Sequence, residues 1–242
     1  MTENDSMWWQ MDQLAANIAA VRANIEHAAE CARRSPNEIT LIAVSKTKPL
    51  EMIRAIYQLG VTDFGENRVQ EALPKLEAFH PQDLHWHMIG HVQTNKASKV
   101  AAAFDSVQSV DSLHLAQALD RHAGAHARRL PILLQVNVAG EASKEGMTPH
   151  ETPALARQIA QLPHLDIQGL MTIAPITRQP EEVCPVFRAL HELRDQLRDA
   201  MPDCSWKHLS MGMTDDYTVA IEEGATMVRI GRAIFGERPR KA

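Results

Sequence analysis

The chain has 242 residues, of which 45% are hydrophobic and 23% are charged, with a net charge of −5 and an isoelectric point of about 6.2. This composition is that of a globular protein with a substantial core, and the acidic balance disfavours nucleic acid or an anionic membrane as the main partner. The length fits one α/β barrel as well as two small domains.

The first predicted element is an amphipathic helix. Apolar residues recur at three- and four-residue steps between residues 11 and 34, as at Leu14, Ile18 and Val21. This is the period of a helix with one buried face. Ser35 and Pro36 end the helix.

Short apolar runs alternate with helical segments along the rest of the chain. The predicted strands cover residues 39–45, 62–64, 84–89, 106–109, 131–137, 166–171, 205–209 and 226–230. The predicted helices cover residues 49–59, 66–79, 95–103, 112–127, 149–161, 180–200 and 214–223. Capping signals support two of them: Asp111 and Ser112 precede one, and Thr214, Asp215 and Asp216 open another.

This alternation indicates parallel β-α-β units of the α/β class. Eight strands predict one closed (β/α)8 TIM-type barrel, and a doubly wound sheet is the alternative because the second and fourth strands are short. We predict a single domain over residues 1–242, with an extra N-terminal helix over about 8–34 and the barrel over about 37–238.

A barrel of this kind places its functional site at the carboxyl ends of its strands. Lys46 ends the first predicted strand, on the same face as Val44. Desolvation lowers the pKa of a lysine amine, and a neutral amine attacks an aldehyde to form an imine. A lysine that only extends from a strand end into solvent carries equal weight, and Lys48 is a rival amine.

The last two strands predict a phosphate site. Barrels frequently bind phosphate between the loops that follow strands seven and eight. Ser210 follows the seventh strand, and Gly231 follows the eighth and permits close approach of the backbone. Arg229 is expected to point into the barrel mouth.

Other polar residues near strand ends have ordinary explanations as well. Glu66 and Asn67 are expected to form hydrogen bonds at the mouth, or to cap a helix. Gln135 and Asn137 are expected to reach a ligand or to satisfy each other, with equal weight. The run that holds His85, His87 and His91 lacks zinc-ligand spacing, so no metal is expected.

Several motifs resemble the pyridoxal phosphate homeostasis protein family, which is similar to the N-terminal barrel domain of alanine racemase. They are AVSKTKP, FGEN, WHMIGHVQTNK, GLMTI, LSMGMTDD and MVRIGRAIFGER, in order over nearly the whole chain. The resemblance implies a fold-type III barrel that binds pyridoxal 5′-phosphate (PLP).

The resemblance also implies roles for individual residues. Lys46 is the Schiff-base residue, Asn67 lies near the cofactor ring, and Arg229 faces the pyridine nitrogen. Ser210 and Gly231 hold the phosphate. Met171 is adaptable apolar packing material and is included among the expected cofactor contacts.

One position departs from the family pattern. Arg232 stands after Gly231, where a small hydroxyl residue is expected. It either bonds the phosphate by charge or points to solvent and leaves the phosphate to backbone N–H groups, which we favour slightly.

The resemblance implies a role in intracellular PLP balance, without strong catalysis. The main alternative is a PLP-dependent amino-acid racemase, which needs a second acid–base group opposite Lys46. Alanine racemase takes that group from a tyrosine of a partner subunit, and of the two tyrosines here Tyr217 is the closer candidate.

Partners and location follow from composition and resemblance together. The three cysteines show no pairing pattern, no secretory signal is apparent, and no apolar run approaches the ~20 residues that span a bilayer. We predict a cytoplasmic monomer or weak dimer that binds PLP and serves PLP-dependent apoenzymes, without nucleic-acid or membrane contact.

Overall fold

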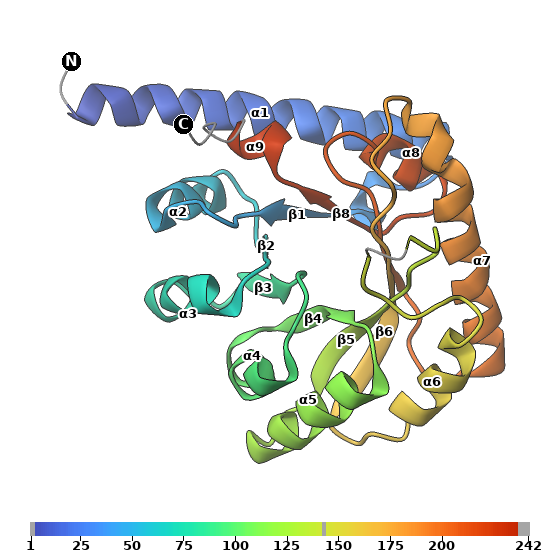
Figure 1. Ribbon diagram of the computed structural model, residues 1–242. Helices are drawn as coiled ribbons and strands as arrows, with labels where there is room; N and C mark the ends of the chain where they lie inside the picture. The colour runs from blue at the N-terminus through green and yellow to red at the C-terminus, as the bar shows by residue number, and fades with distance from the viewer. Residues whose placement is uncertain (1–2, 142–143, 237–242) are drawn as a thin grey trace.

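Eight parallel strands form one closed barrel, in which β1 pairs with both β2 and β8 (Figure 1). The computed structural model describes residues 3–141 and 144–236, with side chains from residue 11 onward. The strands are β1 (Thr40–Val44), β2 (Asp63–Glu66), β3 (His85–Met88), β4 (Ser106–Val110), β5 (Leu130–Gln135), β6 (Leu165–Met171), β7 (His208–Ser210) and β8 (Met227–Ile230). The predicted barrel is confirmed, and the doubly wound sheet is excluded.

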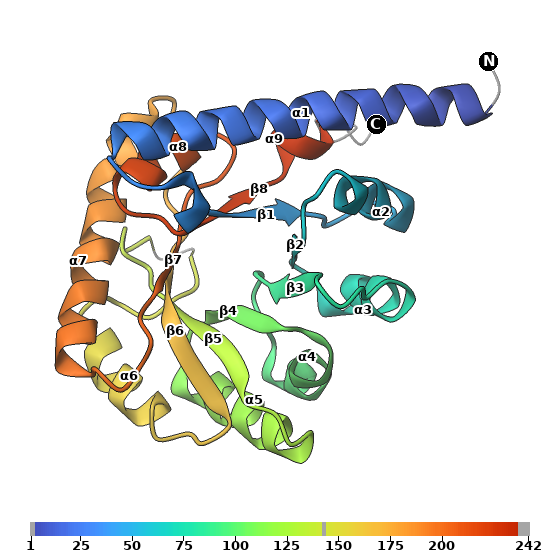
Figure 2. The same cartoon turned by 180° about the vertical axis from the view of Figure 1, so that it is seen from behind.

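The helices lie on the outside of the barrel (Figures 1 and 2). They are α1 (Glu3–Cys31), α2 (Leu50–Gln58), α3 (Val69–Ala78), α4 (Ala97–Ala103), α5 (Leu113–Ala125), α6 (Thr152–Ile159), α7 (Cys184–Ala200), α8 (Tyr217–Glu222) and α9 (Arg232–Phe235), with the 3-10 turns η1 (Pro36–Glu38), η2 (Thr94–Lys96) and η3 (Pro180–Val183). Among the described residues, none of these helices has the length and apolar character needed to cross a bilayer.

The extra N-terminal helix is confirmed. The α1 helix packs along α8 and α9 (Figure 2) and buries the predicted apolar face, including Leu14, Ile18 and Val21. Asn17 and Asn24 fix its position, because they donate to the carbonyl of Ile234 and to the Tyr217 hydroxyl. The helix therefore covers the side of the barrel where β8 returns to β1.

Two boundary predictions need correction. Glu66 belongs to β2 and not to the following helix, which begins at Val69. The α9 turn after β8 was not predicted. The expected end of the barrel near residue 238 lies outside the described residues.

Of the two predicted helix caps, the one at Ser112 is confirmed, whereas α8 begins at Tyr217 and Asp216 makes no side-chain cap bond. The Ser112 hydroxyl accepts a hydrogen bond from the Leu115 N–H group at 3.3 Å, as an N-cap should. Asp216 precedes α8 but accepts from Met213 N–H, behind it in the chain. Asp216 therefore orders the loop after β7.

The barrel interior is only partly apolar. Ile42, Leu133, Met171 and Met227 form a small buried cluster there, whereas the larger core lies between the strands and the helices. The buried side chains of Gln108, Ser210 and Arg229 form a hydrogen-bonded chain, from Gln108 through Ser210 to Arg229. This polar interior is the part of the fold that bears on function.

Gly169 marks an irregularity in β6. Ile132 pairs with Ile167 and Leu133 pairs with Gly169, so Gln168 is an extra residue in β6. The φ angle of Gly169 is +153°, and a methyl group there would lie 1.8 Å from the backbone oxygen of His208. Only glycine lets β6 and β7 approach at this point.

We expect Gly169→Ala to destabilise the protein by roughly 3 kcal/mol or more, because the clash is with backbone that cannot rotate away. Gly140→Ala is the matched control: its φ is +68° but nothing lies within 4 Å of the added methyl group, so about 1 kcal/mol is expected. Urea unfolding measures both. Equal losses would contradict the role of close strand approach.

Candidate functional site

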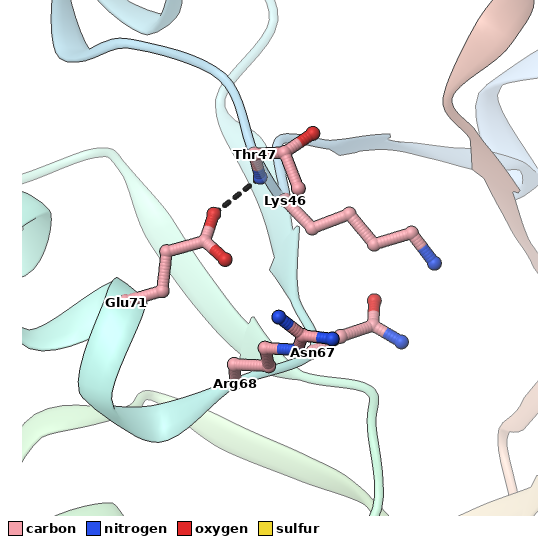
Figure 3. Close-up of a pocket in the computed structure, with 5 residues that line it drawn as sticks. All are labelled: Lys46, Thr47, Asn67, Arg68 and Glu71. Carbon is pink, nitrogen blue, oxygen red and sulfur yellow. Dashed lines mark hydrogen bonds between the residues drawn. The ribbon is translucent and has the colours of Figure 1, made fainter. Parts of the chain in front are cut away.

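A cavity lies at the carboxyl ends of β1 and β2, where a barrel places its chemistry. Its volume is about 160 Å³, and it is lined by Lys46, Thr47, Asn67, Arg68 and Glu71 (Figure 3). Figure 3 shows the side chains of Lys46 and Asn67 extending in the same direction. The structure thus brings together two of the residues predicted from the sequence.

The turn after Lys46 has an unusual backbone. Thr47 has φ +65°, in the left-handed region that β-branched residues rarely occupy. Its N–H group donates to the carboxylate of Glu71 on α3 (Figure 3). This side-chain acceptor holds a conformation that the local sequence would not choose.

A buried ion pair between α3 and β2 also holds this turn in place. Lys75 Nζ lies 2.8 Å from Glu66 Oε1 and 3.1 Å from Glu71 Oε1, and it donates to the carbonyl of Ser45 at 3.1 Å. The Ser45 hydroxyl donates to Glu66 at 2.8 Å. Residues on both sides of Lys46 are therefore tied to α3.

Glu66 itself does not face the mouth as predicted from the sequence. It points between the barrel and α3, fully buried, because its partner Lys75 lies on that helix. Burial raises the pKa of Glu66, and the hydrogen bonds from Lys75 and Ser45 oppose that shift. Glu66 therefore supports the site without lining it.

Asn67 carries a buried acceptor without a partner. No described residue donates to its Oδ1, although that atom is shielded from solvent. A buried amide oxygen without a hydrogen bond costs about 1–3 kcal/mol, and such atoms recur where a ligand donor binds. Gly90, which follows β3, lets the chain pass close to Asn67, because a methyl group at residue 90 would lie 2.4 Å from the Asn67 carbonyl oxygen.

Arg229 lies in the barrel interior, and its side chain is buried. It donates to the Ser210 hydroxyl at 2.7 Å and to the Thr172 carbonyl at 2.8 Å. Burial lowers the pKa of Arg229 to about 10, against the opposing charge of Asp216. The guanidinium thus stays protonated at neutral pH, with further N–H donors beyond these two bonds.

The Ser210 hydroxyl is already engaged. It donates to Gln108 Oε1 at 2.7 Å while it accepts from Arg229. Its single donor is thereby used. The sequence predicted Ser210 and Arg229 as separate contacts, whereas the structure joins them through one bond.

Gly231 and Arg232 follow β8 at the barrel mouth. A methyl group at Gly231 would lie 3.6 Å from Val44 Cβ, so the loop passes close to the end of β1. The Arg232 side chain is about half exposed and pairs with Asp215 in the loop after β7. Arg232 therefore bridges the two loops at which phosphate was predicted.

Met171 is fully buried in the barrel-interior cluster with Ile42, Leu133 and Met227. It is absent from the described lining of the cavity beside Lys46. The packing role predicted from the sequence is confirmed, and a cofactor contact stays a prediction.

Gln135 and Asn137 satisfy local backbone. Gln135 donates to the carbonyl of Glu145, and Asn137 donates to the carbonyls of Glu141 and Lys144. The two amide nitrogens therefore satisfy loop backbone after β5, and not each other as one alternative expected.

Both tyrosines of the chain are held away from Lys46. The Tyr217 hydroxyl accepts from Asn24 on α1, outside the barrel. The Tyr57 hydroxyl donates to Asp83 at 2.5 Å, before β3. Neither lines the described cavity beside Lys46.

Histidines of the β3 region occupy different environments. His87 lies inside the barrel and bonds Asp63 at 2.8 Å. His91 lies at the mouth, where its ring bonds Asp111 at 3.1 Å. Ligand atoms of His91, Asp111 and Glu145 lie within 4.8 Å of one another, but His91 and Glu145 are exposed, and the His91–Asp111 bond explains the pairing without an ion.

Several residues that shape the site were missed from the sequence. Glu71 and Lys75 are four apart on α3, a spacing that signals a helix ion pair, but nothing local shows that the pair reaches back to β1. Gln108 and Thr172 come from distant strands, so only the closed barrel brings them to Ser210 and Arg229.

Comparison with known proteins connects this geometry to one family. Residues 16–239 match the family model for the alanine racemase N-terminal domain. The chain is 45% identical over 224 residues to the pyridoxal phosphate homeostasis protein of Pasteurella multocida, covering 92% of this chain and 96% of that protein. It is 46% identical over 228 residues to that of Pseudomonas aeruginosa, covering 94% and 97%.

Solved structures of other proteins have the same barrel fold. PipY of Synechococcus elongatus, solved with PLP bound, superposes with a TM-score of 0.82 at 38% identity and covers 93% of this chain and 100% of PipY. An alanine racemase of Clostridium difficile superposes with a TM-score of 0.74 at 17% identity, covering 95% of this chain and 58% of that enzyme. The second likeness shows the shared barrel fold alone.

We expect Lys75→Met to destabilise the protein by about 3–5 kcal/mol, because it leaves Glu66 buried without its counter-charge. Methionine keeps the length and helix propensity of lysine. Urea unfolding at neutral pH measures the loss.

Arg188→Met is the control for this substitution, since it removes a similarly close ion pair with Glu223 whose arginine side chain is 61% exposed, and a much smaller loss is expected. A Lys75→Met protein as stable as the wild type would show that the buried pair does not hold this region.

Proposed function

The chain belongs to the family of pyridoxal phosphate homeostasis proteins, and we propose that it binds PLP covalently through Lys46 and acts in the intracellular balance of PLP without strong catalysis. The observation that carries this proposal is the cavity in which Lys46 lies beside the unpartnered Oδ1 of Asn67. The relationship to PipY, whose structure holds PLP, supports the same cofactor.

The residues present suit this cofactor. PLP, when bound, supplies an aldehyde that condenses with a primary amine, and Lys46 offers that amine at the mouth. Asn67 offers an acceptor that lacks a protein donor, and PLP carries a ring hydroxyl as a donor. Met171 remains a proposed contact from the barrel interior.

For the phosphate we propose Ser210, Gly231 and Arg232. The Ser210 hydroxyl would have to leave Gln108 in order to donate, so we assign most of the contact to Gly231 and Arg232. Arg232 already pairs with an anionic group, the Asp215 carboxylate, and a phosphate would compete for the same guanidinium. This modifies the slight preference, made from the sequence, for backbone groups alone.

For the ring nitrogen we propose Arg229. A protonated guanidinium only donates hydrogen bonds, so it keeps a pyridine nitrogen that faces it unprotonated. Ser210, Thr172 and Asp216 hold Arg229 in that state. An unprotonated pyridine withdraws fewer electrons from the reacting carbon, which suits holding a cofactor, or racemase chemistry, better than transamination.

Racemisation is less well supported. It requires a second acid–base group on the opposite face of the substrate, and the hydroxyls of Tyr57 and Tyr217 are bonded elsewhere. The solved alanine racemase, at 17% identity, shares the barrel fold, and that likeness carries no activity. We also propose that the protein is a cytoplasmic monomer or weak dimer, with the barrel domain as its functional unit, and that it passes PLP to apoenzymes.

We expect Lys46→Ala to abolish the covalent adduct. Wild-type protein incubated with PLP should turn yellow, and borohydride reduction should add the mass of one reduced cofactor, located on Lys46 by peptide mass spectrometry. The variant should show neither change because it lacks the amine at the cavity.

Lys48→Ala is the matched control. Lys48 lies two residues away but donates to the carbonyl of Phe235 on α9, so this variant should load like the wild type. An undiminished adduct in Lys46→Ala, or its loss in Lys48→Ala alone, would contradict the assignment.

We expect no racemase turnover at or above ~1 s⁻¹, which is already low for an enzyme. The assay supplies PLP and single enantiomers of several amino acids and follows optical composition. Faster turnover that Tyr217→Phe removes would favour the racemase instead.

A further inference from the structure

Gln108 lies on β4 inside the barrel, and its side chain is fully buried. Its Oε1 atom accepts from the Ser210 hydroxyl on β7 at 2.7 Å. Its Nε2 atom lies 3.2 Å from Nδ1 of His87 on β3 and 3.6 Å from the sulfur of Met227 on β8. One amide thus connects β4 to side chains of three other strands, and it does not line the described cavity beside Lys46.

The orientation of this amide follows from the pair of His87 and Asp63. His87 Nε2 lies 2.8 Å from Asp63 Oδ1, and a carboxylate only accepts, so Nε2 carries a proton. In a neutral ring Nδ1 is then an acceptor, and it faces the Gln108 Nε2 group and the Ser106 hydroxyl, which lies 2.6 Å away. A reversed amide would set Gln108 Oε1 against the Nδ1 lone pair. The Oε1 atom is therefore directed to Ser210.

This orientation determines what Ser210 can offer to a ligand. A hydroxyl has one donor and two acceptor lone pairs. The Ser210 proton goes to Gln108, and one lone pair receives the Arg229 guanidinium at 2.7 Å. A phosphate monoester carries a charge of about −1.5 to −2 at pH 7 and presents acceptor oxygens. The free lone pair of Ser210 cannot bind such a group, so Ser210 has to give up its bond to Gln108 first.

We propose that Gln108 is a positioning residue that competes with the phosphate of PLP for the Ser210 proton and thereby lowers the affinity for PLP. When Ser210 turns to a phosphate, Gln108 Oε1 loses its donor inside the barrel, and a buried acceptor without a partner is costly. The loss of one bond thus offsets the gain of the other. This role of Gln108 rests on the proposed function, because it concerns the proposed phosphate contact of Ser210.

Gln108→Met tests this role, because methionine fills a similar volume and its thioether accepts only weakly. The Ser210 proton then loses its strong acceptor in the free protein, whereas the Ser106 hydroxyl can still donate to His87 Nδ1. We expect the variant to bind PLP about fivefold more tightly than the wild type, which is roughly 1 kcal/mol. Absorbance titration gives the apparent Kd. A merely structural role of Gln108 would weaken binding and not strengthen it.

Three comparisons locate the effect. Pyridoxal, which lacks the phosphate, should bind equally to Gln108→Met and to the wild type. Ser210→Ala should change the wild-type Kd by less than about twofold, because it removes both competing bonds, and it should cancel the gain in the double variant. Gln168→Met is the matched control, since this β6 glutamine donates to Asp166 and not to Ser210, and its Kd should equal that of the wild type.

The directions of the hydrogen bonds can be tested without PLP. Nitrogen NMR of the His87 ring in the free protein should show the proton on Nε2 and a lone pair on Nδ1. A proton on Nδ1 would allow the Gln108 amide to face the other way, with Nε2 donating to Ser210. The Ser210 proton would then be available to a phosphate without competition, and the proposed role of Gln108 would be wrong.

Unchanged or weaker binding of PLP by Gln108→Met would overturn this role, as would a gain that survives Ser210→Ala. If methionine prevents folding, Gln108→Val, which is shorter and suits a strand, should give the same gain. Borohydride reduction of the same samples shows whether PLP is attached to Lys46. A wild type that does not load PLP would overturn both proposals, whereas loading on Lys46 without the gain would overturn only the role of Gln108.

Discussion

The ammonium group of Lys75 is the contact on which the site depends. It lies between two carboxylates and the Ser45 carbonyl, beneath the point where β1 ends. Without it, two carboxylates from β2 and α3 would repel each other in a poorly solvated space. Because Glu71 also accepts from Thr47, the same charge cluster sets the backbone on both sides of Lys46. The direction of the Lys46 side chain is therefore determined by a neighbouring helix as well as by its strand.

The barrel interior shows a related constraint on Arg229. A buried guanidinium is tolerated only where acceptors surround it, and here Ser210 and the Thr172 carbonyl provide them. Ser210 in turn relies on Gln108, whose amide nitrogen lies 3.2 Å from His87 Nδ1. One hydrogen-bonded chain thus runs from His87 and Asp63 at the amino-terminal end to Arg229 near the mouth. Arg229 cannot change its position without breaking bonds in the barrel interior.

The barrel could be predicted from the sequence because the apolar periodicity of each strand and helix depends only on neighbouring residues. The α1 face and the Ser112 cap were read correctly, since period and capping are properties of neighbouring residues. Lys46 and Asn67 were placed together because strand ends of a barrel converge. The sequence placed Glu66 wrongly at the barrel mouth, because its partner Lys75 lies on the following helix, α3, and draws the side chain toward that helix. The bonds among Gln108, Ser210 and Arg229 join β4, β7 and β8, and no local period encodes such contacts.

The two ends of the barrel carry different chemical groups. At the carboxyl end, Lys46 offers an amine, and Arg232 and Asp215 join the loops after β7 and β8. At the amino-terminal end, Asp63 bonds His87 at 2.8 Å, and burial lowers the pKa of His208 to about 4. Two-base racemisation at the proposed cofactor would need a second acid–base group opposite Lys46, and the hydroxyls of both tyrosines are bonded elsewhere. The structure constrains how the Arg229 guanidinium and the backbone beside Lys46 are held. This arrangement fits the proposed cofactor-holding role better than the alternative of two-base racemisation.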